Sequence, residues 1–315
     1  MSTEPHNESG SNSSSTPRRS GTVTFVGRPN AGKSTLMNLL LEEKLAIVSS
    51  KPQTTRNRLV GILSGARGQM VFYDTPGVHK PQHRMNRAMI KAAQEALNEA
   101  DVLCLLVDAS QPFGGGDEFM LSWIRSATAP KILLLNKIDK VEKTSLLPRI
   151  ARYAETGLFA EIVPISALRA DGTDLVLDTL WSYLPEGEAA YDPELLTVHP
   201  ERFLVAERIR EKVLLQTGDE LPFSTAVVIE AWEEKGELVV IHASILAERD
   251  GQKKILVGSK GQKIKAIGAA ARADLEEYLD CRVYLDLKVK VERNWRENKR
   301  ILTELDRDVY AAGLS

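Results

Sequence analysis

Residues 27–34 read Gly-Arg-Pro-Asn-Ala-Gly-Lys-Ser and lie between the apolar run TVTFV (22–26) and a helical pattern that begins at Lys33. They fit the spacing G-x-x-x-x-G-K-[ST], in which the backbone wraps a phosphate and points its N–H groups inward. Glycine allows that turn without Cβ clashes, and the following helix N-terminus adds a favourable field. Lys33 can then reach the β- and γ-phosphates, and the Ser34 hydroxyl can bind Mg²⁺. The stretch predicts a nucleotide-triphosphate site between a strand and a helix.

Short apolar runs alternate with longer helical patterns around this loop, from residue 22 to residue 184. Continuous apolar strands separated by helices indicate an α/β domain, with a mostly parallel sheet and helices on both faces. Strands are expected at 22–27, 58–63, 69–77, 101–110, 131–139 and 161–168. Helices are expected at 33–44, 84–100, 119–127 and 174–184.

Two further segments suit the triphosphate and its metal. Asp74-Thr75-Pro76-Gly77 ends a buried strand, so Asp74 can hold Mg²⁺ through a water and the Gly77 N–H can meet the γ-phosphate. Residues 51–58, KPQTTRNR, lie between the first helix and the second strand. One threonine of this segment is expected to complete the Mg²⁺ shell; we favour Thr55, with Thr54 close behind.

Two later segments suit a guanine base. Asn136-Lys137-Ile138-Asp139 ends a strand, and the Asp139 carboxylate can accept hydrogen bonds from guanine N1–H and N2–H₂, a pair that adenine does not offer. Asn136 can bond the base edge and brace neighbouring loops, while the Lys137 stem can cover the base. A backbone N–H near Ser166-Ala167 can read guanine O6.

The expected cofactors are GTP or GDP with Mg²⁺. The predicted catalytic residues are Lys33, Thr55, Asp74 and Gly77, and the predicted metal ligands are Ser34, Thr55 and, through water, Asp74. The predicted nucleotide-binding residues are Gly27, Arg28, Pro29, Asn30, Ala31, Gly32, Lys33, Ser34, Thr35, Asp74, Thr75, Pro76, Gly77, Val78, Asn136, Lys137, Ile138, Asp139, Ser166 and Ala167.

Hydrolysis of GTP needs positioning and charge neutralisation rather than covalent chemistry. Many GTPases carry a water-orienting glutamine directly after the glycine of the second motif, but here that residue is Val78. The attacking water must then be oriented by a backbone group, a switch residue, a monovalent ion or a partner. His79 is a weaker candidate for this role, because it is more simply interpreted as a surface histidine. The sequence predicts slow intrinsic hydrolysis that a partner stimulates.

The bulk composition is that of an ordinary globular protein. The chain has 315 residues, a formal net charge of −2 and 43% hydrophobic residues, so any nucleic-acid surface must be local. Cys104 and Cys281 lie far apart in hydrophobic runs and are expected to be free thiols in a reducing compartment. No apolar run approaches the roughly 18 residues of a membrane span, and no signal-peptide pattern is present.

The order of elements changes in the second half of the chain. We expect a disordered tail at 1–19, a nucleotide-binding domain at 20–185, a linker at 186–200, a second domain at 201–293 and a helical tail at 294–315. The second domain reads as helix, strand, strand, short helix, GSKG loop, helix, strand. This α+β order is that of the type II (prokaryotic) KH arrangement.

The GSKG loop at 258–261 is predicted to clamp a nucleic-acid backbone. It lacks G-K-[ST] and a base-reading segment, and six basic residues against one acidic lie between positions 249 and 265. A solvated lysine-rich helix start remains the alternative. The predicted RNA contacts are Lys253, Lys254, Gly258, Ser259, Lys260, Gly261, Lys263 and Lys265. The apolar side of the cleft is expected from Ile255, Val257, Ile264 and Ile267, some of which can be core.

Residues 288–300 carry six basic and two acidic side chains around Trp295. They either extend the RNA surface, because aromatic rings stack on bases, or pack the tail of the chain. The sequence leaves both interpretations open.

The GTPase segments together with the KH loop, and KPQTTR with DTPGVH in particular, resemble the bacterial Era family within the TrmE–Era class of P-loop GTPases. The resemblance covers about residues 20–300. It implies a GTP-dependent, monomeric RNA-binding protein of small (30S) ribosomal subunit assembly that binds 16S rRNA near its 3′ end. It also implies a cytoplasmic protein with peripheral association with the cell membrane.

Alternative functions are separable by experiment. A signalling GTPase whose C-terminal domain binds protein would hydrolyse GTP without a response to RNA. An RNA-binding module with an inactive nucleotide site would keep its GTP affinity after Lys33→Ala. An ATPase would be indifferent to Asp139→Asn. Other Era-like branches, such as tRNA-modifying or tandem-domain GTPases, lack this layout of one GTPase domain and one KH domain.

Overall fold

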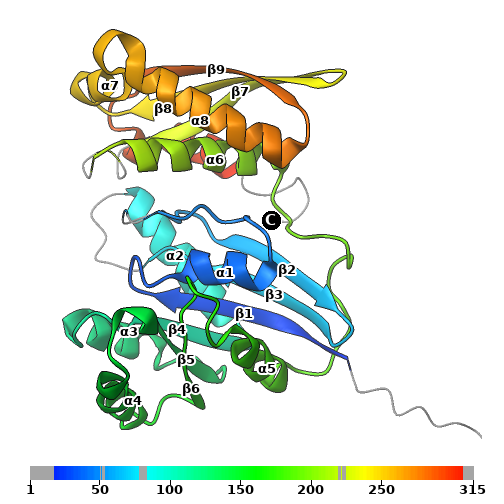
Figure 1. Ribbon diagram of the computed structural model, residues 1–315, viewed down its shortest axis with the longest axis vertical. Helices are drawn as coiled ribbons and strands as arrows, with labels where there is room; N and C mark the ends of the chain where they lie inside the picture. Colours follow the sequence, from blue (N-terminus) through cyan, green and yellow to red (C-terminus); the bar gives the residue numbers. More distant parts are fainter. Residues whose placement is uncertain are drawn as a thin grey trace, which may run out of the picture.

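The protein folds into two domains that lie against each other (Figure 1). The structure, a computed structural model, describes residues 18–49, 51, 54–77, 84–218, 221 and 225–307. Most of the predicted tail at 1–19 lies outside these residues. None of the described helices combines the length and the apolar composition needed to cross a bilayer.

The first domain is built on a six-stranded sheet with the strand order β2-β3-β1-β4-β5-β6. Only the β2–β3 pair is antiparallel, which confirms the predicted mostly parallel sheet. The strands are β1 (Arg19–Gly27), β2 (Leu59–Gly65), β3 (Gly68–Asp74), β4 (Val102–Asp108), β5 (Lys131–Asn136) and β6 (Glu161–Pro164). The carboxyl ends of the parallel strands meet at one edge, where α/β sheets carry their ligands.

Helices cover both faces of this sheet, as the sequence predicts (Figure 1). They are α1 (Lys33–Leu41), α2 (Arg84–Asn98), α3 (Gly115–Ile124), α4 (Leu146–Ala154) and α5 (Thr173–Tyr183), with short 3₁₀ helices η1 (Ile138–Lys140) and η2 (Lys143–Ser145). One apolar core joins Met37 of α1 and Trp181 of α5, and another joins Leu97 of α2, Ile124 of α3 and Tyr153 of α4. The sheet is thus buried on both sides.

Several predicted boundaries differ from the observed ones. β1 begins at Arg19 rather than Thr22, because its backbone pairs with β3 from Gly68 onward. The first helix ends at Leu41, since Glu42 takes a left-handed conformation with φ 55°. The strands predicted at 69–77, 131–139 and 161–168 end at Asp74, Asn136 and Pro164, so the motif residues that follow each of them lie outside the sheet, with Ile138 and Asp139 in η1.

The second domain has a three-stranded sheet of order β7-β8-β9, with β7–β8 antiparallel and β8–β9 parallel. This matches the predicted KH arrangement. Its elements are α6 (Glu201–Gln216), β7 (Ala226–Lys235), β8 (Leu238–Ala247), α7 (Asp250–Val257), η3 (Ser259–Gly261), α8 (Gln262–Leu279) and β9 (Arg282–Val291), followed by η4 (Trp295–Glu297) and α9 (Lys299–Arg307). Ile209 of α6, Ile241 of β8 and Leu275 of α8 lie in its core.

The segment between the domains, 186–200, packs along the first sheet. The Gln69 side-chain oxygen accepts hydrogen bonds from the backbone N–H groups of Ala190 and Tyr191, each at 2.9 Å. The Val60 N–H donates to Nε2 of His199 at 2.8 Å. These contacts tie the connection to β2 and β3.

The position of Trp295 decides between the two interpretations of residues 288–300. Its side chain is fully buried and packs with Met85 and Met89 of α2 and with Ala226 and Leu246 of the second sheet. A buried ring cannot stack on an RNA base. Trp295 therefore packs the tail of the chain at the junction of the two domains.

Candidate nucleotide site and nucleic-acid loop

A cavity of about 420 Å³ lies at the carboxyl edge of the first sheet, in the volume range typical of ligand sites. Twelve of the predicted nucleotide-site residues line it: Pro29, Asn30, Gly32, Lys33, Ser34, Thr35, Thr55, Gly77, Asn136, Lys137, Asp139 and Ala167. Segments far apart in sequence thus converge on one space.

The remaining predicted residues either do not line this cavity or lie outside the described chain. Thr75 is buried, and its hydroxyl donates to the Phe25 carbonyl oxygen at 2.7 Å. Residues outside the cavity lining are Gly27, Arg28, Ala31, Asp74, Thr75, Pro76, Ile138 and Ser166. Val78 and His79 lie outside the described residues.

The phosphate loop places Lys33 at the start of α1, where the residue is only 6% exposed. Its Nζ donates to the carbonyl oxygens of Gly27 and Arg28 at 3.3 and 3.4 Å. Burial lowers the pKa of Lys33, although the nearby Asp74 carboxylate opposes that shift. A phosphate in the loop would supply further negative charge for this buried cation.

Gly32 shows why the loop requires glycine at that position. Its φ is +102°, and a Cβ there would lie 2.2 Å from Nδ2 of Asn136. That amide nitrogen donates to the Ala31 carbonyl oxygen at 2.8 Å. The close approach therefore couples the phosphate loop to the end of β5.

Three oxygen-bearing side chains meet beside the phosphate loop. Ser34 Oγ lies 2.6 Å from Asp74 Oδ2 and 2.9 Å from Thr55 Oγ1, and Thr55 Oγ1 lies 3.0 Å from Asp74 Oδ2. Asp74 is fully buried, and its Oδ1 has no hydrogen-bond partner among the described residues. Burial raises the pKa of Asp74, against the charge of Lys33 and the two hydroxyl bonds. Because hard cations prefer such oxygen ligands, this set fits Mg²⁺.

The two candidate threonines differ in position. Thr55 belongs to the oxygen cluster just described, whereas Thr54 Oγ1 donates to the Lys51 carbonyl oxygen at 2.7 Å. The Thr54 carbonyl oxygen accepts a hydrogen bond from Nη2 of Arg210 on α6. The geometry favours Thr55 as the residue near the metal and gives Thr54 a contact with the second domain.

The residues predicted to read the base are braced by one another. Asn136 Oδ1 accepts from the backbone N–H groups of Lys137 and Ala167 at 2.8 and 3.0 Å. Asp139 Oδ1 accepts from the Ser166 hydroxyl at 2.6 Å. Ser166 thus orients the carboxylate from behind, and the predicted loop-bracing role of Asn136 is present in the geometry.

Asp108, at the end of β4, supports a residue of the cavity lining, and the sequence interpretation missed it. Its Oδ2 pairs with Lys137 Nζ at 2.7 Å, and the same ammonium donates to the Asn30 carbonyl oxygen at 2.6 Å. The hydrogen bonds from Lys137 and Ser110 lower the pKa of Asp108 despite its partial burial. The signal was available, because Asp108 ends a parallel strand at the same sheet edge as Asp74 and Asn136.

The GSKG loop lies between α7 and α8 in the second domain (Figure 1). Gly258, Lys260 and Gly261 all have positive φ values of 72°, 49° and 76°. A Cβ on Gly258 would lie 2.6 Å from Cβ of Lys263, so the turn needs glycine there. Exposed side chains around the loop are those of Lys253, Lys254, Ser259, Lys260 and Lys265.

Two residues assigned to this loop from sequence have other contacts. Lys263 is half-buried, and its Nζ donates to the Gln216 carbonyl oxygen at the end of α6 at 2.9 Å. Ile267 is fully buried in the domain core, so it cannot form the apolar side of an open cleft. Ile255 is 48% exposed and remains available for that side.

Comparisons with protein families agree with this two-domain division. The family described as "50S ribosome-binding GTPase" matches residues 22–137, and the family described as "KH domain" matches residues 220–296. The curated "GTPase Era" of Geobacter metallireducens is 46% identical over 294 residues, which cover 93% of this chain and 99% of that protein. The "GTPase Era" of Staphylococcus haemolyticus is 42% identical over 291 residues, covering 92% and 97%.

Solved structures give the same result. A single-residue variant of Aquifex aeolicus Era bound to GDP·AlF₄⁻ superposes with a TM-score of 0.88 at 38% identity, covering 91% of this chain and 98% of that one. Era in complex with MgGDPNP and nucleotides 1506–1542 of 16S ribosomal RNA superposes with a TM-score of 0.89 at 37% identity, with the same coverage. The likeness therefore extends over both domains.

Proposed function

The chain belongs to the Era family of GTPases, and from that premise we propose that it couples its GTP cycle to binding of 16S rRNA near the 3′ end during assembly of the 30S subunit. The observation that carries this proposal is the presence of two unlike phosphate sites on separate domains. One is a buried loop with a lysine and a metal-ligand set, and the other is an exposed loop with lysines and no metal ligand among its described residues. A solved relative holds a guanine nucleotide analogue and 16S rRNA together.

We assign one role to the residues around the phosphates and Mg²⁺ and another to the residues around the base. Lys33 and the phosphate-loop N–H groups bind and neutralise the phosphates, and the Gly77 N–H meets the γ-phosphate. Ser34 and Thr55 hold Mg²⁺ directly and Asp74 holds it through water; the ion neutralises the charge that develops on the phosphates. Asp139, oriented by Ser166, selects guanine.

Thr55 gives a first prediction. We expect Thr55→Ala to slow Mg²⁺-dependent GTP hydrolysis by about tenfold or more, because it removes one oxygen from the metal shell. Thr54→Ala is the matched control, since it removes a hydroxyl that donates to the Lys51 carbonyl oxygen and lies outside the oxygen cluster. The measurement is single-turnover hydrolysis across a Mg²⁺ titration. A larger loss in Thr54→Ala than in Thr55→Ala would reverse the assignment.

We propose that the RNA backbone lies on the GSKG loop, with Lys260 at its tip and Lys253, Lys254 and Lys265 beside it. All four side chains are exposed, and glycine at positions 258 and 261 lets the backbone approach a sugar-phosphate chain closely. Lys263 acts behind them by holding the end of α6.

Lys260 gives the test of this proposal. Lys260→Glu is expected to weaken binding of a 16S 3′-end oligonucleotide by about ten- to a hundredfold, because it places a carboxylate against phosphate. GTP affinity is expected to stay unchanged. Lys235→Glu, at the tip of the β7–β8 hairpin, is the matched charge reversal away from the loop. Joint loss of RNA and GTP binding, or equal weakening by the control, would contradict the separation of the two sites.

We further propose, on the family resemblance, that the protein acts as a monomer in the cytoplasm and associates peripherally with the cell membrane.

We also propose that the chain divides at the limits 20–185, 186–200, 201–293 and 294–315. The matched range 22–137 lies within the first domain, and the matched range 220–296 extends from the second domain across the limit at 293.

A further inference from the structure

A second cavity, of about 430 Å³, lies between the two domains and is as large as the nucleotide cavity. Its wall comes from the segment after Thr55, from α2, from α6 and β7 of the second domain, and from η4 and α9 near the C-terminus. Among the described residues, neither the nucleotide site nor the GSKG loop contributes to this lining.

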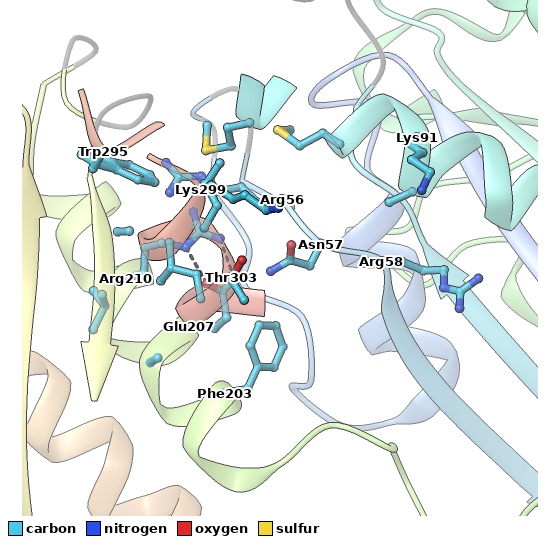
Figure 2. A pocket seen from close by; sticks show the side chains of 18 of the residues that line it. Arg56, Asn57, Arg58, Lys91, Phe203, Glu207, Arg210, Trp295, Lys299 and Thr303 are labelled. Atoms are coloured by element: carbon cyan, nitrogen blue, oxygen red, sulfur yellow. Dashed lines mark hydrogen bonds and ion pairs between the residues drawn. The ribbon is translucent and has the colours of Figure 1, made fainter. Parts of the chain in front are cut away.

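The cavity combines an apolar wall with buried positive charge. Its apolar side is lined by Met89, Phe203, the buried Trp295 and the partly buried Leu302. Arg56, Arg210 and Lys299 line it as cations, and Figure 2 shows these three side chains gathered beside Trp295. The more distant Arg58 and Lys91 already pair with Glu99 and Glu95.

The hydrogen bonding of Arg210 indicates that the cavity binds an anionic ligand. Its side chain is 2% exposed, and its Nε and Nη2 bind Glu207 on the same helix (Figure 2). Its Nη1 is buried with no hydrogen-bond partner among the described residues. A buried guanidinium N–H without an acceptor is costly, so an acceptor from a ligand would stabilise it.

Arg56 adds a second positive charge at the same wall. Its Nη1 donates to the Thr225 carbonyl oxygen at 2.6 Å, and its guanidinium lies 5.7 Å from the Trp295 ring centroid. Burial, followed by repulsion from Arg210, lowers the pKa of Arg56 to about 9. Glu207 offsets one of these two positive charges, so the buried Arg210 and the half-buried Arg56 together keep an excess of positive charge that favours an anion.

We propose that this interdomain cavity binds a small organic anion with an apolar body, whose acidic group faces Arg210 and Arg56 and whose body packs on Met89, Phe203 and Leu302. Charge complementarity and the apolar wall together select this class over a neutral molecule or a bare inorganic ion. The ligand would lie next to the Thr54 carbonyl oxygen that Arg210 holds, and so beside the segment that carries Thr55. The site is distinct from those for GTP and RNA.

The probe is 8-anilinonaphthalene-1-sulfonate, titrated against the full chain with the nucleotide cavity saturated by Mg-GDP. We expect one saturable site per chain with a Kd on the order of 10 µM. N-phenyl-1-naphthylamine, the same body without the sulfonate, is expected to bind about tenfold more weakly or worse. Absence of saturable binding, or equal binding of the neutral probe, would overturn the proposal.

Two variants locate the probe. Lys299→Glu reverses an exposed charge of the lining, and Arg210→Gln combined with Glu207→Gln removes the buried cation without leaving its carboxylate unpaired. Each is expected to weaken probe binding about tenfold, while Lys235→Glu is expected to leave it unchanged. If the double variant fails to fold, the affinity of the probe for Lys299→Glu alone tests whether it binds in this cavity. Unchanged affinity in Lys299→Glu would place the probe elsewhere and refute the site.

Discussion

Asp139→Asn is expected to weaken GTP binding about a hundredfold and to leave ATP binding as weak as before. The carboxylate accepts from guanine N1–H and N2–H₂, and hydrogen bonds to a charged group contribute about 1.5–3 kcal/mol. An asparagine amide can accept only one of these bonds and turns a donor towards the other. Ser166, which holds Asp139 Oδ1 at 2.6 Å, would keep the substituted side chain in place. Equilibrium titration with a fluorescent GTP analogue measures the loss.

The matched control is Asp171→Asn, a change of the same chemistry at an exposed carboxylate nearby. Its backbone bonds Ser166, but its side chain does not line the nucleotide cavity. Xanthosine triphosphate sharpens the test further, because its O2 can accept from the asparagine amide. We expect this nucleotide to bind Asp139→Asn better than GTP does. Unchanged GTP affinity in Asp139→Asn would remove this residue from base selection.

Lys33→Ala is expected to weaken GTP binding about a hundredfold or more and to abolish measurable hydrolysis. Truncating one partner of a buried, hydrogen-bonded charge pair costs about 2–5 kcal/mol, and each 1.4 kcal/mol is about tenfold. Lys33 is 6% exposed, and its ammonium donates to two backbone carbonyl oxygens of the phosphate loop. The same ammonium would also contact the bound phosphates. Isothermal titration with GTP and Mg²⁺ gives the affinity of the variant.

Lys140→Ala is the control for Lys33→Ala, since Lys140 lines the same cavity but is exposed. We expect at most a few-fold loss there, because an exposed charge interacts weakly. RNA binding to the GSKG loop is expected to survive both substitutions. GTP affinity equal to that of the unsubstituted protein in Lys33→Ala would show that the first loop does not hold the triphosphate.

Much of the first domain was predictable because its signals are local. The alternation of apolar strands and helices indicated the sheet class, and the motifs named most residues of the nucleotide cavity. α4 was not among the predicted helices, although Pro148 lies in its first turn, where proline is tolerated. The same local reasoning passed over Asp108, whose strand ends without a familiar motif.

Contacts between the domains could not be predicted, since they join residues distant in the chain. Glu211 of α6 accepts from Lys44 Nζ at 2.7 Å and from the Val48 N–H at 3.1 Å. Arg210 reaches the Thr54 carbonyl oxygen in the same way. Sequence periodicity marks α6 as a helix but does not say which surface it meets. For this reason Trp295 stayed ambiguous, and the interdomain cavity had no signal in the sequence.

We infer that one domain holds GTP and the other holds a defined ribosomal RNA segment. Crosslinking of the GTP-loaded protein to total cellular RNA, followed by sequencing of the footprint, tests it most directly, with Lys260→Glu as the control variant. We predict a footprint concentrated near the 3′ end of 16S rRNA that disappears in Lys260→Glu. A footprint spread at random over cellular RNA, or one that persists in the variant, would contradict the account.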